Sequence, residues 1–192
     1  FYEIAIPALE YVVARNDPQY GLLSRFYLAR IYADSSSAYT DHTKAYMLFI
    51  SIADENADMD PDDLRRAPFV AKALTAVAND VRDGLPEARL APDLERAIEY
   101  LRHAATFFNE ADAQFELAKI DLADDRRRPN GLHFLQKLAK ESHPGAQAML
   151  ADLLFRGKYM KEDRAQALGL IRMAAENAPP SDRLWIEDIY QN

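Results

Sequence analysis

A short residue pattern recurs along the chain at intervals typical of helical repeats. An aspartate is followed four residues later by an alanine, then by a large apolar residue and a pair of small residues. Copies begin at Asp41, Asp93 and Asp163, and a weaker copy runs from Asn130-Gly131 to Leu138-Ala139. The aspartate is suited to cap a helix, the alanine lets two helices approach closely, and the large residue fills the gap between repeats. The pattern therefore predicts an array of helix pairs.

The apolar periodicity agrees with this interpretation. Apolar residues recur every three or four positions in stretches of about 12 to 18 residues, and nearly all of the 6 glycines and 10 prolines lie between the stretches. No alternating strand pattern is present, so an all-α fold is predicted. Capping signals such as Asp60-Pro61 and Pro92-Asp93 place the helix starts. The predicted helices span residues 2–14, 20–34, 41–55, 61–82 (with a break near Pro68), 92–107, 110–124, 130–141, 145–156, 162–177 and 181–190.

The spacing between copies indicates the type of repeat. The second small residues, at positions 53, 105, 139 and 175, lie 52, 34 and 36 residues apart, whereas simple tetratricopeptide repeats have a period of about 34. Residues 146–176 contain Ala-Gln-x-x-Leu-Ala-x-x-Leu-x-x-Gly, followed by Asp-x-x-x-Ala and Ala-Ala-Glu. This motif resembles the Sel1-like repeat family, whose repeats carry a variable loop between their two helices. The resemblance implies a right-handed α-solenoid over the whole chain.

The predicted organisation is a single solenoid over residues 1–192. Because the chain begins with Phe1 inside a helical pattern, we expect it to be part of a longer precursor. The apolar face of the first helix then needs cover from a preceding segment or a neighbouring chain, such as the second copy of a homodimer. Residues 1–15 are interpreted as the second half of a truncated repeat, 20–57, 61–108, 110–142 and 145–178 as full repeats, and 181–192 as a C-terminal capping helix.

A narrower resemblance rests on the segments Ser24–Tyr32, Asp41–Ala57 and Asp62–Ala73. They resemble the family of periplasmic Sel1-like proteins that negatively regulate exopolysaccharide production in rhizobia. The resemblance implies a non-enzymatic periplasmic regulator, made with a signal peptide, that binds the periplasmic sensor domain of a membrane histidine kinase in a two-component system. It also implies that a periplasmic protease cleaves the regulator and releases the kinase, with acid as a trigger. The alternatives are a general Sel1-like scaffold or adaptor with an unknown protein client and, from another class, an enzyme or polysaccharide-binding module.

The composition argues against several other functions. The chain has 23 lysines and arginines against 31 aspartates and glutamates, and its net charge of −8 disfavours nucleic acid as a partner. It has no cysteine, which removes disulfides, zinc fingers and thiol nucleophiles. No apolar run approaches the roughly 20 residues that span a bilayer, so no membrane insertion is expected. The 4 histidines lack metal-site spacing, and no phosphate-binding loop or Ser-His-Asp motif is present, so no metal, cofactor or catalysis is expected.

The candidate partner-binding residues follow from the expected repeat geometry. Phe26, Arg30, Phe115, Lys119 and Asp152 occupy first-helix positions that are expected to point away from the seam between helices. In a solenoid such positions line the concave surface, where partners bind.

Two further candidates concern regulation. His103 precedes Ala104-Ala105 in a packed helix, so its protonation could loosen a contact between repeats. The alternative is an ordinary half-buried histidine. Arg126, Arg127 and Arg128 form a basic run that is predicted to be a solvated loop. A protease-sensitive site or a partner contact is the alternative for this run.

Overall fold

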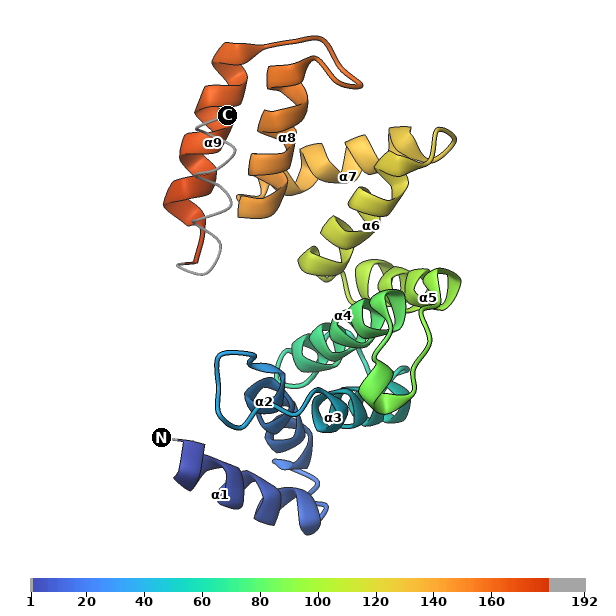
Figure 1. The fold of residues 1–192 in the computed structure, drawn as a ribbon, viewed down its shortest axis with the longest axis vertical. Coiled ribbons are helices and arrows are strands. Elements are labelled where there is room, and N and C mark those ends of the chain that lie inside the picture. Colours follow the sequence, from blue (N-terminus) through green and yellow to red (C-terminus); the bar gives the residue numbers. More distant parts are fainter. Residues whose placement is uncertain (1, 180–192) are drawn as a thin grey trace. The chain divides into compact units, whose positions relative to one another are not determined.

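The computed structural model describes residues 2–179, and over this range it is all-helical, as predicted (Figure 1). Successive helices pack as helix-turn-helix pairs, for example α2 with α3, α4 with α5 and α8 with α9. The predicted segment 181–192, with its helix at 181–190, lies outside the described residues. Within the described range the elements are α1 (Tyr2–Ala14), α2 (Gly21–Ala33), α3 (His42–Glu55), α4 (Ala67–Asp83), the short 3-10 helix η1 (Pro86–Ala88), α5 (Leu94–Thr106), α6 (Ala111–Ala123), α7 (Arg128–Lys140), α8 (Pro144–Arg156) and α9 (Arg164–Asn177).

The chain divides into two compact units, Phe1–Gln114 and Phe115–Asn192. The largest fully buried apolar side chains of the first unit come from α3, α4 and α5, and those of the second from α7: Ile52, Val70, Leu74, Val77, Val81 and Leu101, then Leu135 and Leu138. The predicted continuation of one solenoid through both units stays a prediction. Within the described part of the chain, no helix has both the length and the apolar content that crossing a bilayer requires.

Three helix pairs are closed by the aspartate of the repeated pattern. The side chain of Asp41 accepts a hydrogen bond from the N–H of Lys44 at 2.9 Å and so caps α3. The backbone N–H of Asp41 donates to the carbonyl of Tyr32, near the end of α2, at 2.9 Å. Asp93 and Asp163 make the same two kinds of bond at the starts of α5 and α9. The aspartate thus begins the second helix and fixes the loop to the first, which confirms its predicted capping role.

The fourth copy departs from the pattern, and other contacts close its helix pair. Arg127 stands at the capping position of α7 and makes no side-chain capping bond. Instead, Nε of Arg128 donates to the carbonyl of Leu122, near the end of α6, at 3.2 Å. Gly131 replaces the buried alanine, and a Cβ at this position would lie 2.9 Å from the carbonyl oxygen of Ala118. The backbones of α6 and α7 therefore approach more closely than an alanine permits.

Buried glutamines link successive helix pairs. In the second unit, Nε2 of Gln147 donates to the carbonyl of Ala139 at 3.1 Å, and its Oε1 accepts from Asn177 at 3.4 Å. In the first unit, Nε2 of Gln114 donates to the carbonyl of Ala105 at 3.0 Å. Both carbonyls belong to the second small residue of the preceding pair. The Ala-Gln step of the motif therefore places a buried amide that ties the start of one helix pair to the end of the preceding pair.

The helix predicted at 61–82 begins later, at Ala67, which corrects the predicted boundary. The side chain of Asp63 accepts a hydrogen bond from the N–H of Arg66 at 3.1 Å and holds the preceding residues in turns. Pro68 lies in the first turn of α4, where its missing N–H costs no helical hydrogen bond. The proline therefore helps to start this helix and does not break it.

Replacing Gln147 by alanine is expected to lower the free energy of unfolding of the second unit by about 1–3 kcal/mol, because the buried side-chain hydrogen bonds to the carbonyl of Ala139 and to Asn177 are lost. Urea denaturation followed by circular dichroism measures this change. Gln166→Ala is the matched control, since that side chain is exposed and makes no hydrogen bond within residues 2–179; its effect is expected to stay within about 0.5 kcal/mol. Equal midpoints for the two variants would show that the glutamine link does not stabilise the array.

Candidate protein-binding surface

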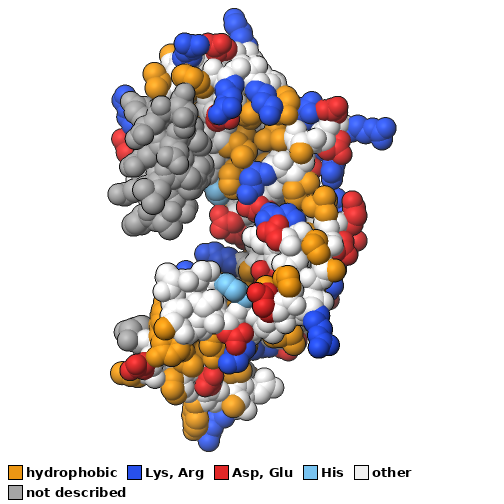
Figure 2. All heavy atoms as spheres, in the orientation of Figure 1, with side chains coloured by type: hydrophobic (Ala, Val, Ile, Leu, Met, Phe, Trp, Pro, Cys, Tyr) orange, Lys and Arg blue, Asp and Glu red, His pale blue; other side chains and the backbone are white. Residues whose placement is uncertain are grey.

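The first unit carries an apolar groove beside its first helix. α1 has the most apolar sequence of the helices in the described range, yet none of its residues is buried. Figure 2 shows hydrophobic side chains gathered around α1. A groove of about 800 Å³ is formed by α1, α2, α3 and α4. Its lining is mostly small or apolar and consists of Tyr2, Ala5, Ala8, Leu9, Tyr27, Arg30, Ile31, Ala33, Asp34, Phe49 and Ala76.

Arg30, one of the predicted partner-binding residues, contributes to this groove. Its side chain is exposed and makes no ion pair or hydrogen bond within residues 2–179. Tyr27, one turn earlier on α2, lines the same groove and is 45% exposed. Tyrosine and arginine on an apolar surface are the residue types that dominate binding at protein interfaces. The groove is therefore the candidate protein-binding surface of the first unit.

Phe26 does not lie on this surface, which corrects its predicted orientation. Its side chain is only 4% exposed. Its ring centroid lies 5.1 Å from that of Phe69 on α4 and 5.8 Å from that of Phe49 on α3. Successive residues of an α-helix point about 100° apart, so Phe26 fills the space between three helices while Tyr27 faces the groove. On α2 the prediction thus held for the position of Arg30 and chose the wrong one of two adjacent aromatic residues.

The remaining predicted partner residues lie in the second unit and make local contacts. The ring of Phe115 packs on His143 with centroids 4.9 Å apart, and Nζ of Lys119 lies 5.0 Å from the Phe115 centroid. Asp152 pairs with Arg156, one turn later on α8, at 2.6 Å. The structure thus brings Phe115 and Lys119 together, whereas Asp152 belongs to a separate ion pair. A role for these three residues in partner binding stays a prediction.

His103 is held by a contact that tolerates protonation. Its Nε2 donates to the carbonyl of Ala57 at 2.8 Å, and its ring stacks on Phe107 with centroids 5.0 Å apart. A carbonyl oxygen only accepts, so Nε2 carries a proton in both the neutral ring and the imidazolium. Protonation of Nδ1 leaves this bond in place. The pH-sensing role of His103 stays a prediction, and this hydrogen bond does not supply its mechanism.

His143 uses a ring nitrogen as an acceptor, whereas His103 uses one as a donor. It is the N-cap of α8, and its Nδ1 accepts a hydrogen bond from the N–H of Ala146 at 3.1 Å. An imidazolium has no acceptor, and it would place a positive charge at the positive end of the helix dipole. Protonation of His143 therefore removes this cap. A sequence signal for the role exists, because His143 precedes Pro144 and proline favours the first helical position.

The arginine run is only partly solvated. Nε of Arg127 pairs with Asp124 at 3.1 Å. Arg128 is the first residue of α7, and its guanidinium lies 4.1 Å from the ring centroid of Tyr159. Arg126 is exposed, and its side chain makes no ion pair, hydrogen bond or ring contact within residues 2–179. Cleavage in this run stays a prediction, and Arg126 is the residue most open to a protease.

The sequence did not indicate that two carboxylates of the first unit, Glu110 and Asp80, have raised pKa values. Oε2 of Glu110 accepts from the N–H of Ala113 at 2.6 Å and from Oγ1 of Thr75 at 3.1 Å. Burial is the main cause that raises the pKa of Glu110, and the charge of Asp112 adds to the rise. Burial likewise raises the pKa of Asp80 on α4. Both carboxyl groups therefore bind a proton more readily in the folded than in the unfolded chain. Within residues 2–179, no three potential metal-ligating side chains are grouped to hold an ion.

Solved structures share this arrangement of helices. The chain is similar to the crystal structure of a Sel1 repeat protein from Oxalobacter formigenes, with a TM-score of 0.62 at 15% identity over 88% of this chain and 63% of that chain. The chain has the Sel1-like repeat fold. A second structure, the protective antigen c5321 of uropathogenic Escherichia coli, which displays an SLR fold, matches this Sel1-like chain with a TM-score of 0.54. The identity there is 18%, over 96% of this chain and 44% of that one.

Two curated proteins are similar in sequence to the Sel1-like chain. An exopolysaccharide production negative regulator from Rhizobium leguminosarum bv. viciae is 28% identical over 171 residues, which is 88% of this chain and 61% of the relative. The protein of the same description from Rhizobium meliloti (strain 1021) is 26% identical over 167 residues, 85% of this chain and 60% of the relative. The chain thus spans about three-fifths of the length of these distant homologues. No family model matches it.

Glu110 is expected to raise the free energy of unfolding when the pH is lowered, and replacing it by glutamine is expected to remove this contribution. Because the folded-state pKa of Glu110 is raised, its contribution is absent at neutral pH and grows as the pH falls through that pKa. Glutamine does not titrate, yet its Oε1 still accepts both hydrogen bonds. Urea midpoints at pH 7 and pH 5 measure the effect. The change in midpoint from pH 7 to pH 5 should be less favourable to the folded state in the variant than in the unchanged chain. Glu87→Gln, which removes one exposed carboxylate, is the control. Identical pH dependence in Glu110→Gln and the unchanged chain would contradict this assignment.

Replacing His143 by alanine is expected to lower the free energy of unfolding of the second unit by about 1 kcal/mol, the usual value of an N-cap, because the N–H of Ala146 loses its side-chain acceptor. His143→Asn is the matched control, since asparagine supplies another capping acceptor at the same position. Urea midpoints provide the measurement. Equal midpoints for the two variants would show that this cap does not stabilise the unit.

Proposed function

We propose that this chain is a non-enzymatic negative regulator of exopolysaccharide production, which acts in the periplasm by binding the periplasmic sensor domain of a two-component histidine kinase. The observation that carries the proposal is the homology to two exopolysaccharide production negative regulators over 88% and 85% of the chain. The similarity is spread over both compact units and is not confined to one repeat. A regulator of this kind needs a surface for a partner protein and no reacting groups.

The groove beside α1 supports the binding part of the proposal. Arg30 and Tyr27 are exposed in an apolar groove of about 800 Å³. No described residue forms an ion pair with the guanidinium of Arg30. A partner that supplies a carboxylate at the rim and apolar side chains in the groove would satisfy both features. We assign this surface to contact with the sensor domain.

Two features support the proposed release by proteolysis and acid. Arg126 offers an exposed cleavage point in the loop before α7, which is suited to a periplasmic protease. The start of α8 in the second unit is capped by Nδ1 of His143, an acceptor that an imidazolium lacks, and we propose that loss of this cap exposes the unit to a protease.

A general Sel1-like scaffold or adaptor with another protein client is the second candidate. The likeness to the Sel1 repeat protein of Oxalobacter formigenes supports it, because this fold alone does not determine the client. The two candidates differ in whether the sensor domain binds.

Calorimetric titration of the chain against the periplasmic domain of the sensor kinase from the same organism tests the proposal. We expect a 1:1 complex, with Arg30→Glu weakening it at least tenfold, which corresponds to about 1.4 kcal/mol. The matched control is Arg65→Glu, because Arg65 is also exposed and its side chain makes no ion pair within residues 2–179. The control should bind as the unchanged chain does. Absence of binding by the unchanged chain would reject this function and leave the scaffold.

A further inference from the structure

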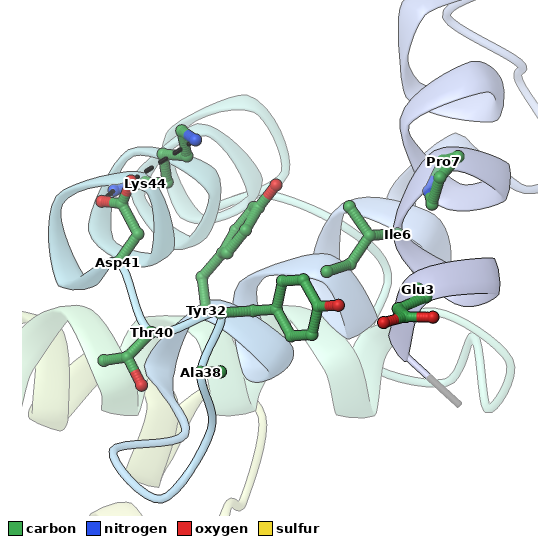
Figure 3. A pocket seen from close by; sticks show the side chains of 9 residues that line it. Glu3, Ile6, Pro7, Tyr32, Ala38, Thr40, Asp41 and Lys44 are labelled. Atoms are coloured by element: carbon green, nitrogen blue, oxygen red, sulfur yellow. Dashed lines mark hydrogen bonds and ion pairs between the residues drawn. The ribbon is translucent and has the colours of Figure 1, made fainter.

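A second hollow lies beside α1, next to the face that lines the apolar groove. Its volume is about 480 Å³, and it is formed by α1, the end of α2, the loop before α3 and the first turn of α3. Figure 3 shows Tyr32 between Asp41 and Lys44 on one side and Glu3 and Ile6 of α1 on the other. Unlike the groove, this pocket combines aromatic walls with charged side chains.

Two tyrosine rings form the aromatic walls, and a contact with α1 holds each of them. The hydroxyl of Tyr32 donates to Oε1 of Glu10 at 2.9 Å. The ring of Tyr39 packs edge-on against Tyr2 with centroids 6.3 Å apart. Burial raises the pKa of Tyr39, and the negative charge of Glu3 adds to the rise, so this carboxylate acts on the Tyr39 ring.

The charge in the pocket is predominantly negative. The carboxylates of Glu3 and Asp41 line it, and Glu10 lies against the Tyr32 hydroxyl. Within the described residues, neither Glu3 nor Glu10 forms an ion pair. Burial together with Glu10 and Asp41 raises the pKa of Tyr32 to about 12, as expected where the local potential is negative.

Lys44 already shows how a cation sits in this environment. Its Nζ lies 5.1 Å from the ring centroid of Tyr32 and 3.4 Å from Oδ2 of Asp41. Lysine thus uses one ring and one carboxylate. The ring of Tyr39 and the carboxylate of Glu3 form a similar combination that no cation of residues 2–179 occupies.

We propose that this pocket binds an arginine side chain presented by a partner protein, between the Tyr39 ring and the Glu3 carboxylate. A guanidinium is planar, stacks on aromatic rings and donates two parallel hydrogen bonds to one carboxylate, and it is more weakly hydrated than an ammonium group. The net charge of −8 also favours a basic contact from the partner. This inference rests on the proposed function, since it names a contact by which the regulator holds its partner.

Two-dimensional ¹⁵N–¹H NMR of the full chain, titrated with N-acetyl-arginine amide, tests the pocket directly. We expect saturable shifts at the amides of Tyr39, Thr40 and Asp41, with a dissociation constant on the order of millimolar for so small a ligand. N-acetyl-citrulline amide has nearly the same shape without the charge and should bind at least tenfold more weakly. Glu3→Gln should weaken the arginine amide at least fivefold, whereas Glu87→Gln, an exposed carboxylate elsewhere in the unit, should leave it unchanged.

The same spectra show whether Glu3→Gln remains folded, so its loss of binding is separable from loss of structure. Shifts that do not saturate, or equal binding of the citrulline amide, would overturn the arginine pocket even if the sensor domain binds. Saturable arginine binding by a chain that does not bind the sensor domain would support the pocket and reject the proposed function. Where both bind, Glu3→Gln should also weaken the sensor-domain complex, and unchanged affinity there would reject the pocket as part of that interface.

Discussion

Three helix pairs of the structure depend on a backbone hydrogen bond that ties the start of the second helix to the end of the first. The N–H groups of Asp41, Asp93 and Asp163 donate to first-helix carbonyls at 2.7–3.1 Å while their side chains cap the helix that follows. One residue thereby fixes both the loop and the direction of the next helix. The pair then presents a defined apolar face to its neighbour, and the surfaces beside α1 exist because these pairs are held in place.

Much of the fold could be predicted because these interactions are local in sequence. An aspartate followed four residues later by alanine contains most of the information for a cap and a close helix contact, and it marked three of the helix starts correctly. The start of α4 was predicted six residues early, since Asp60-Pro61 has the sequence of a helix start, whereas Asp63 holds the residues up to Arg66 in a turn and the helix begins at Ala67 without a side-chain cap. A helix start that lacks a side-chain cap carries no capping signal in the sequence.

The candidate site was predicted less completely, because its residues are chosen by tertiary packing. Phe26 and Tyr27 are adjacent aromatic residues, and the position of α4, whose Phe69 meets the Phe26 ring, decides which of them is buried. Histidines pose a similar problem. A ring nitrogen of His103 donates to a carbonyl, whereas a ring nitrogen of His143 accepts from an N–H. The sensitivity to protonation follows from the partner and not from the residue type.

The position of α1 connects the two surfaces of the first unit. Its residues Ala5 and Leu9 face the apolar groove, whereas Glu3 and Ile6 face the tyrosine-walled pocket, so two hollows flank one helix. This leaves the most apolar helix of the described range without a single buried residue. A partner that fills both hollows would remove apolar area of α1 from water at roughly 25 cal/mol per Å². Because such a partner binds only the folded unit, the same burial that provides affinity would also raise the stability of the first unit in the complex. Partner binding and the anchoring of α1 are thus two consequences of one interaction.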